Sequence, residues 1–75
     1  RILLTQGIGQ ALINRIEAWA LNHHIRRIEA TVVTENINAI ELFKGMGFQI
    51  EGELKDKLFI NQKYYNEYVM AKILN

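Results

Sequence analysis

The stretch IRRIEATVVTENINAIELFKGMGF, residues 25–48, decides the fold class of this 75-residue chain. Its first part, residues 25–34, is mostly apolar and rich in β-branched side chains, which predicts a buried strand. From residue 35 on, the apolar positions return at helical spacing and share one face, namely Ile37, Ile40 and Phe43 or Leu42. Gly45 and Gly47 end this helix, one of them as a left-handed cap. A buried strand that leads directly into a helix predicts an α/β fold.

A second helix is predicted upstream, from residue 8 to about residue 23. Its apolar side chains recur every four residues in a stripe that two further side chains widen: Ile8, Leu12, Ile16 and Ala20, with Ile13 and Trp19. His23 and His24 end the helix, where the helix dipole favours a histidine. The segment RILL, residues 1–4, is typical of the last residues of a strand, so we expect the chain to be a fragment.

The residues after the glycines predict an antiparallel hairpin. One strand covers residues 48–54 and is loosened around Gly52, and a second covers residues 64–74. The segment INQK, residues 60–63, is typical of the turn between them. The predicted order is loop, helix, strand, helix, strand, strand. A helix between two strands favours a parallel or mixed sheet, to which the hairpin adds an antiparallel pair.

The composition is that of one small globular domain. Hydrophobic residues make up 49% of the chain and charged residues 23%, a balance that excludes a disordered segment. The formal net charge of +1 argues against a nucleic-acid partner, and no apolar run is long enough for a membrane helix. The absence of cysteine excludes disulfides, thiolate metal sites and a cysteine nucleophile, and we expect a cytoplasmic protein.

Two glycines one residue apart precede the first helix in TQGIGQALI, residues 5–13. The segment is not a dinucleotide fingerprint, because the third glycine position counted from Gly7 is Leu12, and the chain contains no Gly-Lys-Ser/Thr of a Walker loop. Glycines at a helix start let backbone amides turn toward an anion, and the helix dipole favours negative charge there. The amides of residues 6–10 are therefore candidates to bind a pyrophosphate, although the same glycines also fit a loose turn.

Three motifs, in this order, resemble the GNAT superfamily of acetyl-CoA-dependent N-acetyltransferases. QGIGQALI, residues 6–13, is similar to its pyrophosphate loop and the helix after it. ENINAIELFKGMGF, residues 35–48, is similar to its Asn-x-x-Ala-Ile-x-Leu-Tyr-x-x-x-Gly-Phe element. EGELKDKLFINQKYYNEYVMAKIL, residues 51–74, is similar to the closing hairpin of the branch with diamine, ribosomal-protein and amino-acid acetyltransferases. The resemblance covers only the second half of the family's domain, so residues 1–75 are interpreted as a partial domain, the acetyl-CoA-binding half.

The family's loop pattern, Arg/Gln-x-x-Gly-x-Gly/Ala, fits this chain in two registers. In the register that we prefer, Gly7 and Gly9 match the glycine positions, and Leu4 stands where the family has Arg or Gln. The alternative register begins at Gln6 and places Gly9 and Ala11 on the pattern. In the family the phosphate contacts come largely from backbone amides, so the departure at Leu4 is tolerable.

The resemblance implies acetyl-CoA as co-substrate and two groups of binding residues: Gln6, Gly7, Ile8, Gly9, Gln10 and Ala11 at the pyrophosphate, and Asn36, Ala39 and Phe43 on the second helix. Asn36 would bond the pantetheine arm, and its alternative role is the N-cap of that helix. Phe43 stands where many relatives carry a tyrosine that is thought to protonate the departing thiolate, and phenylalanine has no proton to donate. The catalytic residues therefore stay unknown.

Other polar side chains fit structural roles better than chemical ones. The hairpin contains three tyrosines for which a packing role is favoured over a catalytic role: Tyr64, Tyr65 and Tyr68. Three glutamates are candidate bases toward an amine but fit solvated strand ends better: Glu35, Glu51 and Glu53. His23 and His24 have no third ligand to complete a metal site, so we expect a capping role and no metal. Residues 55–57 form an exposed charge cluster, and two methionines belong to the core: Met46 and Met70.

The function that the resemblance implies is transfer of an acetyl group from acetyl-CoA to a primary amine of a small molecule or a protein N-terminus. The family builds the acceptor site largely from its first half, so we expect this chain alone to be inactive. The alternative is a non-catalytic module that binds coenzyme A or pairs with another chain, which Leu4 and Phe43 favour. A half-sheet leaves an open strand edge and an apolar face, so we expect a homodimer, another form of self-association or a missing N-terminal half.

Overall fold

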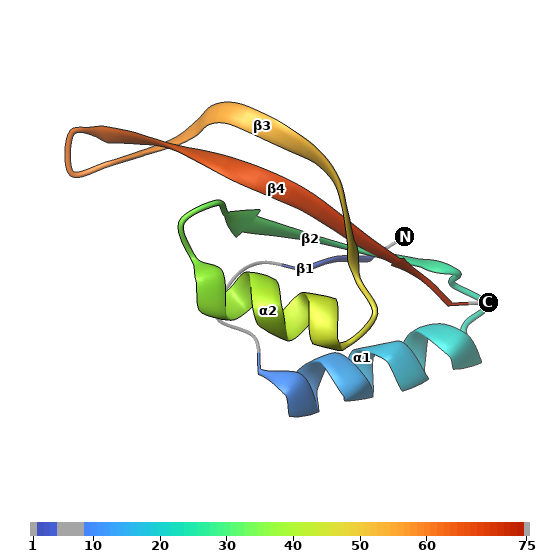
Figure 1. The fold of residues 1–75 in the computed structure, drawn as a ribbon. Helices are drawn as coiled ribbons and strands as arrows, with labels where there is room; N and C mark the ends of the chain where they lie inside the picture. The colour runs from blue at the N-terminus through green and yellow to red at the C-terminus, as the bar shows by residue number, and fades with distance from the viewer. Residues whose placement is uncertain (1, 5–8, 75) are drawn as a thin grey trace.

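The computed structural model describes residues 2–4 and 9–74. Its elements follow the predicted order, and Figure 1 labels them: β1 (Ile2–Leu4), α1 (Gln10–Asn22), β2 (Arg27–Val33), α2 (Ile37–Gly45), β3 (Gln49–Ile60) and β4 (Lys63–Ile73). The strands of the described residues form one sheet in the order β1-β2-β4-β3. β1 and β2 are parallel, whereas the pairs β2–β4 and β3–β4 are antiparallel. The predicted mixed sheet with its closing antiparallel hairpin is confirmed.

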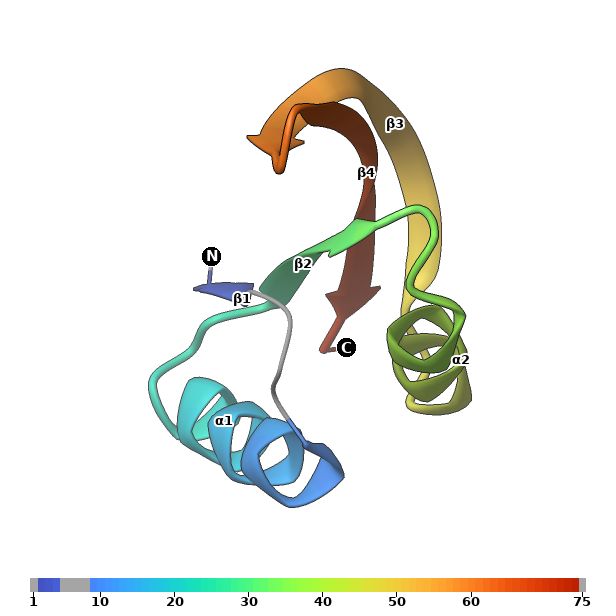
Figure 2. The same ribbon diagram turned by 90° about the vertical axis from the view of Figure 1, so that its left-hand side faces the viewer.

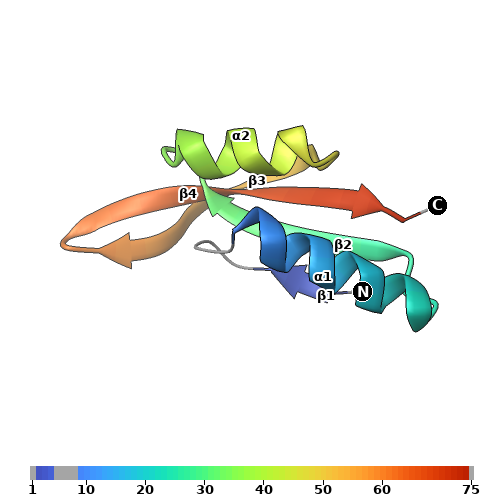
Figure 3. The ribbon, with the colours of Figure 1, turned by 90° about the horizontal axis from the view of Figure 1, so that it is seen from below.

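Both helices lie on one face of this sheet, as Figures 2 and 3 show. Accordingly, Ile28, Ala30 and Val32 of β2 are buried, while the residues between them are half-buried. Alternate side chains of a strand point to opposite faces, so only the helix-covered face of β2 enters the core. Met46 packs half-buried against this core. The largest fully buried side chains come from both layers: Phe43, Ile13, Ile28, Met70 and Val32.

The end of α2 is the left-handed glycine turn that the sequence predicts. Gly47 has a φ of 96°, and Gly45 is the last helical residue. The amide of Phe48 donates to the carbonyl of Phe43 over 2.9 Å, which is the long hydrogen bond of a Schellman cap. This cap reverses the chain and sends it directly into β3.

α1 ends at the two adjacent histidines, His23 and His24, and their capping role is confirmed. The Nδ1–H of His23 donates to the carbonyl of Trp19 over 2.8 Å, and the two rings stack with centroids 4.1 Å apart. His24 has a φ of 60°, and the amide of Ile25 donates to the carbonyl of Ala20 over 2.9 Å. α1 therefore ends in the same Schellman geometry as α2, with a histidine in the left-handed position.

The buried face of α1 differs from the predicted stripe. Ile13 and Ala20 are buried and Ile16 is half-buried, whereas Leu12 is 45% and Trp19 52% exposed. Ile13 and Ala20 lie seven residues apart on one line along the helix, and Leu12 and Trp19 lie on the neighbouring line, about 100° away. The sheet contacts the first line, so the prediction that Leu12 and Trp19 belong to the buried stripe is wrong.

The first strand of the hairpin is longer than predicted. β3 runs to Ile60, whereas the sequence predicts an end near Leu54. Two register shifts against β4 absorb extra residues, one next to Gly52, where the sequence predicts a loosened strand, and one between Leu54 and Leu58. The charged residues 55–57 are exposed, as expected, but they lie inside the strand at its second irregularity.

The hairpin turn lies where the sequence predicts it. Asn61 and Gln62 have φ values of 50° and 63°, the positive values that a two-residue turn between twisted strands needs. Behind the turn, Asn66 fixes the second irregularity of β3. Its Oδ1 accepts from the amide of Asp56 over 2.8 Å, and its Nδ2 donates to Glu53 over 2.8 Å. The hairpin is therefore held in one curved shape by side chains as well as by its ladder.

Candidate functional site

The parallel pair β1–β2 places two helix N-termini at one end of the sheet. The chain leaves the carboxyl end of β1 toward α1 and the carboxyl end of β2 toward α2. In Figure 1 both helices accordingly begin on the side to which the strands β1 and β2 point. Open α/β sheets bind ligands outside the carboxyl ends of their strands, and the N-terminus of a helix carries partial positive charge. This end of the sheet is therefore the candidate site.

The first turn of α1 is open and carries no acidic side chain. Gly9 is the N-cap, with φ −86° and ψ 168°, and its carbonyl accepts from the amide of Ile13 over 3.1 Å. Among the described residues, no side-chain hydrogen bond caps the helix, and Gln10 and Ala11 are exposed. The described part of this turn therefore presents the positive end of α1 to solvent without a compensating carboxylate.

The proposed pyrophosphate residues divide into two groups. Gly9, Gln10 and Ala11 lie on the open first turn. The other three lie outside the described residues, together with the predicted helix start at residue 8: Gln6, Gly7 and Ile8. The role of both groups in binding stays a prediction.

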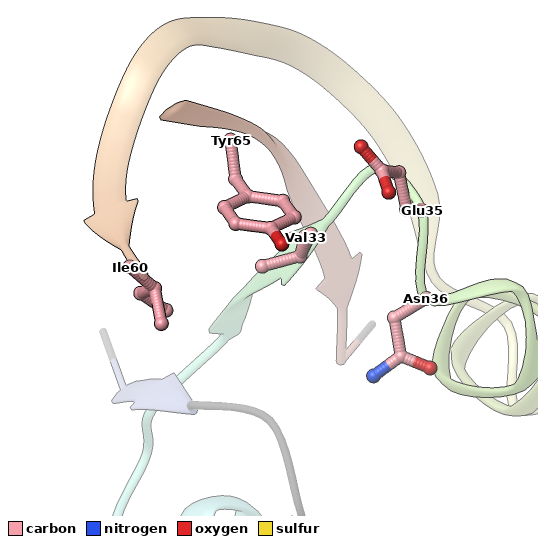
Figure 4. A pocket seen from close by; sticks show the side chains of 5 residues that line it. All are labelled: Val33, Glu35, Asn36, Ile60 and Tyr65. Carbon is pink, nitrogen blue, oxygen red and sulfur yellow. The ribbon is translucent and has the colours of Figure 1, made fainter. Parts of the chain in front are cut away.

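Asn36 caps α2. Its Oδ1 accepts from the amide of Ala39 over 3.2 Å, which places the side chain in the N-cap position that the sequence allows as its alternative role. This hydrogen bond also fixes the orientation of the amide, and Figure 4 shows its Nδ2 turned away from the helix. The cap is thus confirmed, and a ligand contact of Asn36 or Ala39 stays a prediction.

Phe43 lies on the buried face of α2, and its exposed fraction is 1%. Its ring packs edge-on against Phe48, with centroids 5.0 Å apart and an interplanar angle of 70°. The side chain therefore fills the core beneath the helix, and it brings no hydroxyl to the candidate site. Its contact with a cofactor stays a prediction.

A pocket of about 300 Å³ lies at the carboxyl end of β2, where the hairpin arches over this strand. We call it the hairpin pocket, and Figure 4 shows the side chains that line it: Val33, Glu35, Asn36, Ile60 and Tyr65. The sequence presents Glu35 as a candidate base and Tyr65 as a packing residue, but it gives no sign that they share a pocket. Their proximity follows from the long-range pairing of β2 with β4, which puts Val33 opposite Glu67.

The three glutamates considered as bases all have cationic partners. Glu35 pairs with Lys63 over 3.3 Å, and Glu53 pairs with Lys55 over 3.4 Å. Glu51 accepts hydrogen bonds from Arg27, which also pairs with Glu29 over 2.8 Å. The hydrogen bond from Arg27 lowers the pKa of Glu51, because it favours the charged carboxylate. These contacts agree with solvated strand positions better than with a free base.

The described residues support neither a metal site nor a membrane-spanning helix. No group of three or more histidine, cysteine, aspartate or glutamate side chains in residues 2–4 and 9–74 is arranged to hold a metal ion. Neither α1 nor α2, the helices of that part of the chain, is long and apolar enough to cross a membrane.

Comparison with known proteins gives consistent matches. The model of the acetyltransferase (GNAT) domain matches residues 2–69. The L-amino acid N-acetyltransferase AaaT of Escherichia coli K12 is 35% identical over 69 residues, which are 91% of this chain and 43% of AaaT. Spermidine N(1)-acetyltransferase of the same organism is 32% identical over 63 residues, 77% of this chain and 34% of that protein. The chain thus spans less than half the length of these curated relatives.

Solved structures agree with the sequence matches. An acetyltransferase of the GNAT family from Streptococcus pneumoniae superposes with a TM-score of 0.80 at 34% identity, covering 91% of this chain and 42% of that one. Arabidopsis thaliana NAA60 in complex with a bisubstrate analogue superposes with a TM-score of 0.83 at 28% identity, covering 93% and 41%. The fold of this chain is therefore found inside larger acetyltransferase structures.

Proposed function

This chain belongs to the acetyltransferase (GNAT) family, and we propose that it supplies the acetyl-CoA-binding half of an N-acetyltransferase. The reaction is transfer of an acetyl group from acetyl-CoA to a primary amine of a small molecule or a protein N-terminus. The observation that carries the proposal is the open, carboxylate-free first turn of α1, which lies at the same end of the sheet as the start of α2. The relatives are named for transfer to L-amino acids and to spermidine, so an amine acceptor is the common element.

Binding of the donor uses backbone amides at α1 and side chains at α2. The amides of residues 6–11 hold the pyrophosphate, because the start of a helix combines unpaired N–H groups with a favourable dipole. Asn36, whose Oδ1 is already used in the cap, turns its Nδ2 toward a carbonyl of the pantetheine arm. Ala39 offers a small side chain one turn later, and Phe43 supports this face of α2 from the core.

The chemistry is direct transfer and calls on no metal ion. When bound, acetyl-CoA supplies an activated thioester carbonyl. The neutral amine forms the new C–N bond, the C–S bond breaks, and the amine's excess proton leaves through a base while the thiolate takes up a proton. Phe43 has no ionisable proton, so this last proton comes from water or from another residue.

A second candidate function is a non-catalytic module that binds coenzyme A or pairs with another chain. The observation in its favour is Phe43, a buried phenylalanine where many relatives carry an acidic hydroxyl. Self-association fits the strand order, since β1 and β3 are the edge strands of the described sheet. We propose a homodimer or pairing with an N-terminal half as the state in which the sheet is completed, and a cytoplasmic location.

The experiment that tests the proposal is thermal unfolding of the chain with acetyl-CoA. A ligand at about 100 times its Kd stabilises the folded state by about 2.7 kcal/mol. Turnover is measured separately, with acetyl-CoA and a panel of primary amines, on the chain alone and together with the N-terminal half of a relative. Stabilisation together with turnover supports the enzyme, stabilisation alone supports the non-catalytic module, and the absence of both contradicts coenzyme A binding.

A further inference from the structure

The hairpin pocket combines apolar walls with one carboxylate and one aromatic ring. Val33 and Ile60 supply the apolar surface, Glu35 the charge and Tyr65 the ring. In Figure 4 the Glu35 carboxylate and the Tyr65 ring come from two different segments, the β2–α2 connection and the hairpin. A carboxylate beside an aromatic face is a combination that recognises an organic cation.

One organic cation of the chain, the ammonium of Lys63, already lies against two of these residues, although Lys63 does not itself line the pocket. Its Nζ lies 3.3 and 3.4 Å from the two carboxylate oxygens of Glu35 and 4.9 Å from the centre of the Tyr65 ring. The ammonium therefore contacts two of the residues that line the pocket. Both partners of the ion pair are more than half exposed, at 58% for the Lys63 side chain and 59% for Glu35, so the contact is readily exchanged.

A second carboxylate adds negative potential beside the pocket. Glu67 is only 7% exposed and lies directly opposite Val33 in the β2–β4 pairing, two residues along β4 from Tyr65. Within residues 2–4 and 9–74 its side chain has no hydrogen-bond or ion-pair partner. The charge of this carboxylate lies beside the pocket and favours a cation there.

We propose that the hairpin pocket is a binding site for a primary alkylammonium group, and that the ammonium of Lys63, which lies beside the pocket, competes with this group for Glu35 and Tyr65. The inference rests on the proposed function for the identity of the ligand. The nitrogen that accepts the acetyl group has to be neutral, because an ammonium has no lone pair. The pocket therefore takes a second, charged amine of the acceptor and holds it while the neutral amine reacts.

The test is a titration of the full chain with propylammonium, followed by the NMR shifts of the amides of residues 33–36. Lys63→Met removes the internal competitor and is expected to tighten binding about two- to fivefold, the range that a surface ion pair allows. Glu35→Gln is expected to weaken binding by at least a similar factor. Glu53→Gln is the matched control, because Glu53 also pairs with a lysine of the hairpin, Lys55 at 3.4 Å, but does not line the pocket.

The outcomes separate this inference from the proposed function. Tighter binding to Lys63→Met, weaker binding to Glu35→Gln and no change in Glu53→Gln support the site, whether or not acetyl-CoA stabilises the chain. Unchanged or weaker binding to Lys63→Met, or equal effects of the Glu35 and Glu53 variants, overturn it. A parallel titration with Nα-acetyl-lysine methylamide identifies the source of the ammonium: tighter binding of this probe than of propylammonium indicates a peptide lysine, and the reverse a small amine.

Discussion

Substitution of Asn36 separates its capping role from its proposed ligand role. In Asn36→Ala the 3.2 Å hydrogen bond from the amide of Ala39 is lost, and the start of α2 loses its cap. Loss of such a cap costs about 1 kcal/mol, which for a domain of this size lowers the Tm by about 4–8 °C. Asn36→Ser keeps a capping oxygen, so its free energy of unfolding should stay within a few tenths of a kcal/mol of the parent value.

The proposed ligand role of Asn36 predicts that acetyl-CoA affinity, unlike stability, falls in both variants. Both remove the Nδ2 donor, and one hydrogen bond contributes about 0.5–1.5 kcal/mol, so acetyl-CoA should bind about 2- to 12-fold more weakly to each. The assay is chemical denaturation for stability and calorimetric titration for acetyl-CoA, on the parent and both variants. Equal loss of stability in both variants would refute the cap reasoning. Parent-like acetyl-CoA affinity in Asn36→Ser would refute the ligand role and leave the cap as the whole explanation.

Three further substitutions test other parts of the account. Phe43→Tyr forces a hydroxyl into a side-chain site that is 1% exposed, so the free energy of unfolding should fall by about 1–3 kcal/mol, and an unchanged melting curve would contradict the packing described. A gain in turnover despite this loss of stability would identify residue 43 as the position of the missing general acid. Gly47→Ala should destabilise the protein by about 1–2 kcal/mol, because φ is 96° and the new Cβ would stand 3.2 Å from Cε of Lys72; denaturation curves that coincide with the parent would rule this out. Arg27 lowers the pKa of Glu51, so the pair stabilises the fold above the ordinary glutamate pKa, and this contribution is lost as the pH falls through the lowered pKa. The free energy of unfolding should therefore depend less steeply on pH in Glu51→Gln than in the parent, and identical slopes would show that the pair does not contribute.

Local sequence rules predicted the elements whose determinants are local. Gly47 ends α2 because the left-handed position of the cap suits glycine, and that requirement can be read from the residues around it. The hairpin turn at Asn61 and Gln62 is of the same kind. The mixed sheet followed from the order of the elements, because a parallel pair needs a crossover helix and the tail has only a short turn.

Features that depend on tertiary contacts were predicted less well. Leu12 and Trp19 lie on one line along α1, and Ile13 and Ala20 lie on the neighbouring line. Packing against the sheet decides which line is buried, and it buries Ile13 and Ala20. β3 continued past Leu54 because register shifts against its partner accommodate the charged residues. The hairpin pocket was not predictable, since its walls come from β2 and from the hairpin and meet only through long-range strand pairing.

Backbone amides at the start of α1 are proposed to hold the pyrophosphate of acetyl-CoA. The most direct measurement is a ¹H–¹⁵N NMR titration of the chain with acetyl-CoA, read at the amides of Gly9, Gln10 and Ala11. If these amides hold the pyrophosphate, their signals shift together and saturate with one Kd, which rises with salt because the contact is charged. Binding that leaves the three amides unmoved while signals elsewhere shift would contradict it.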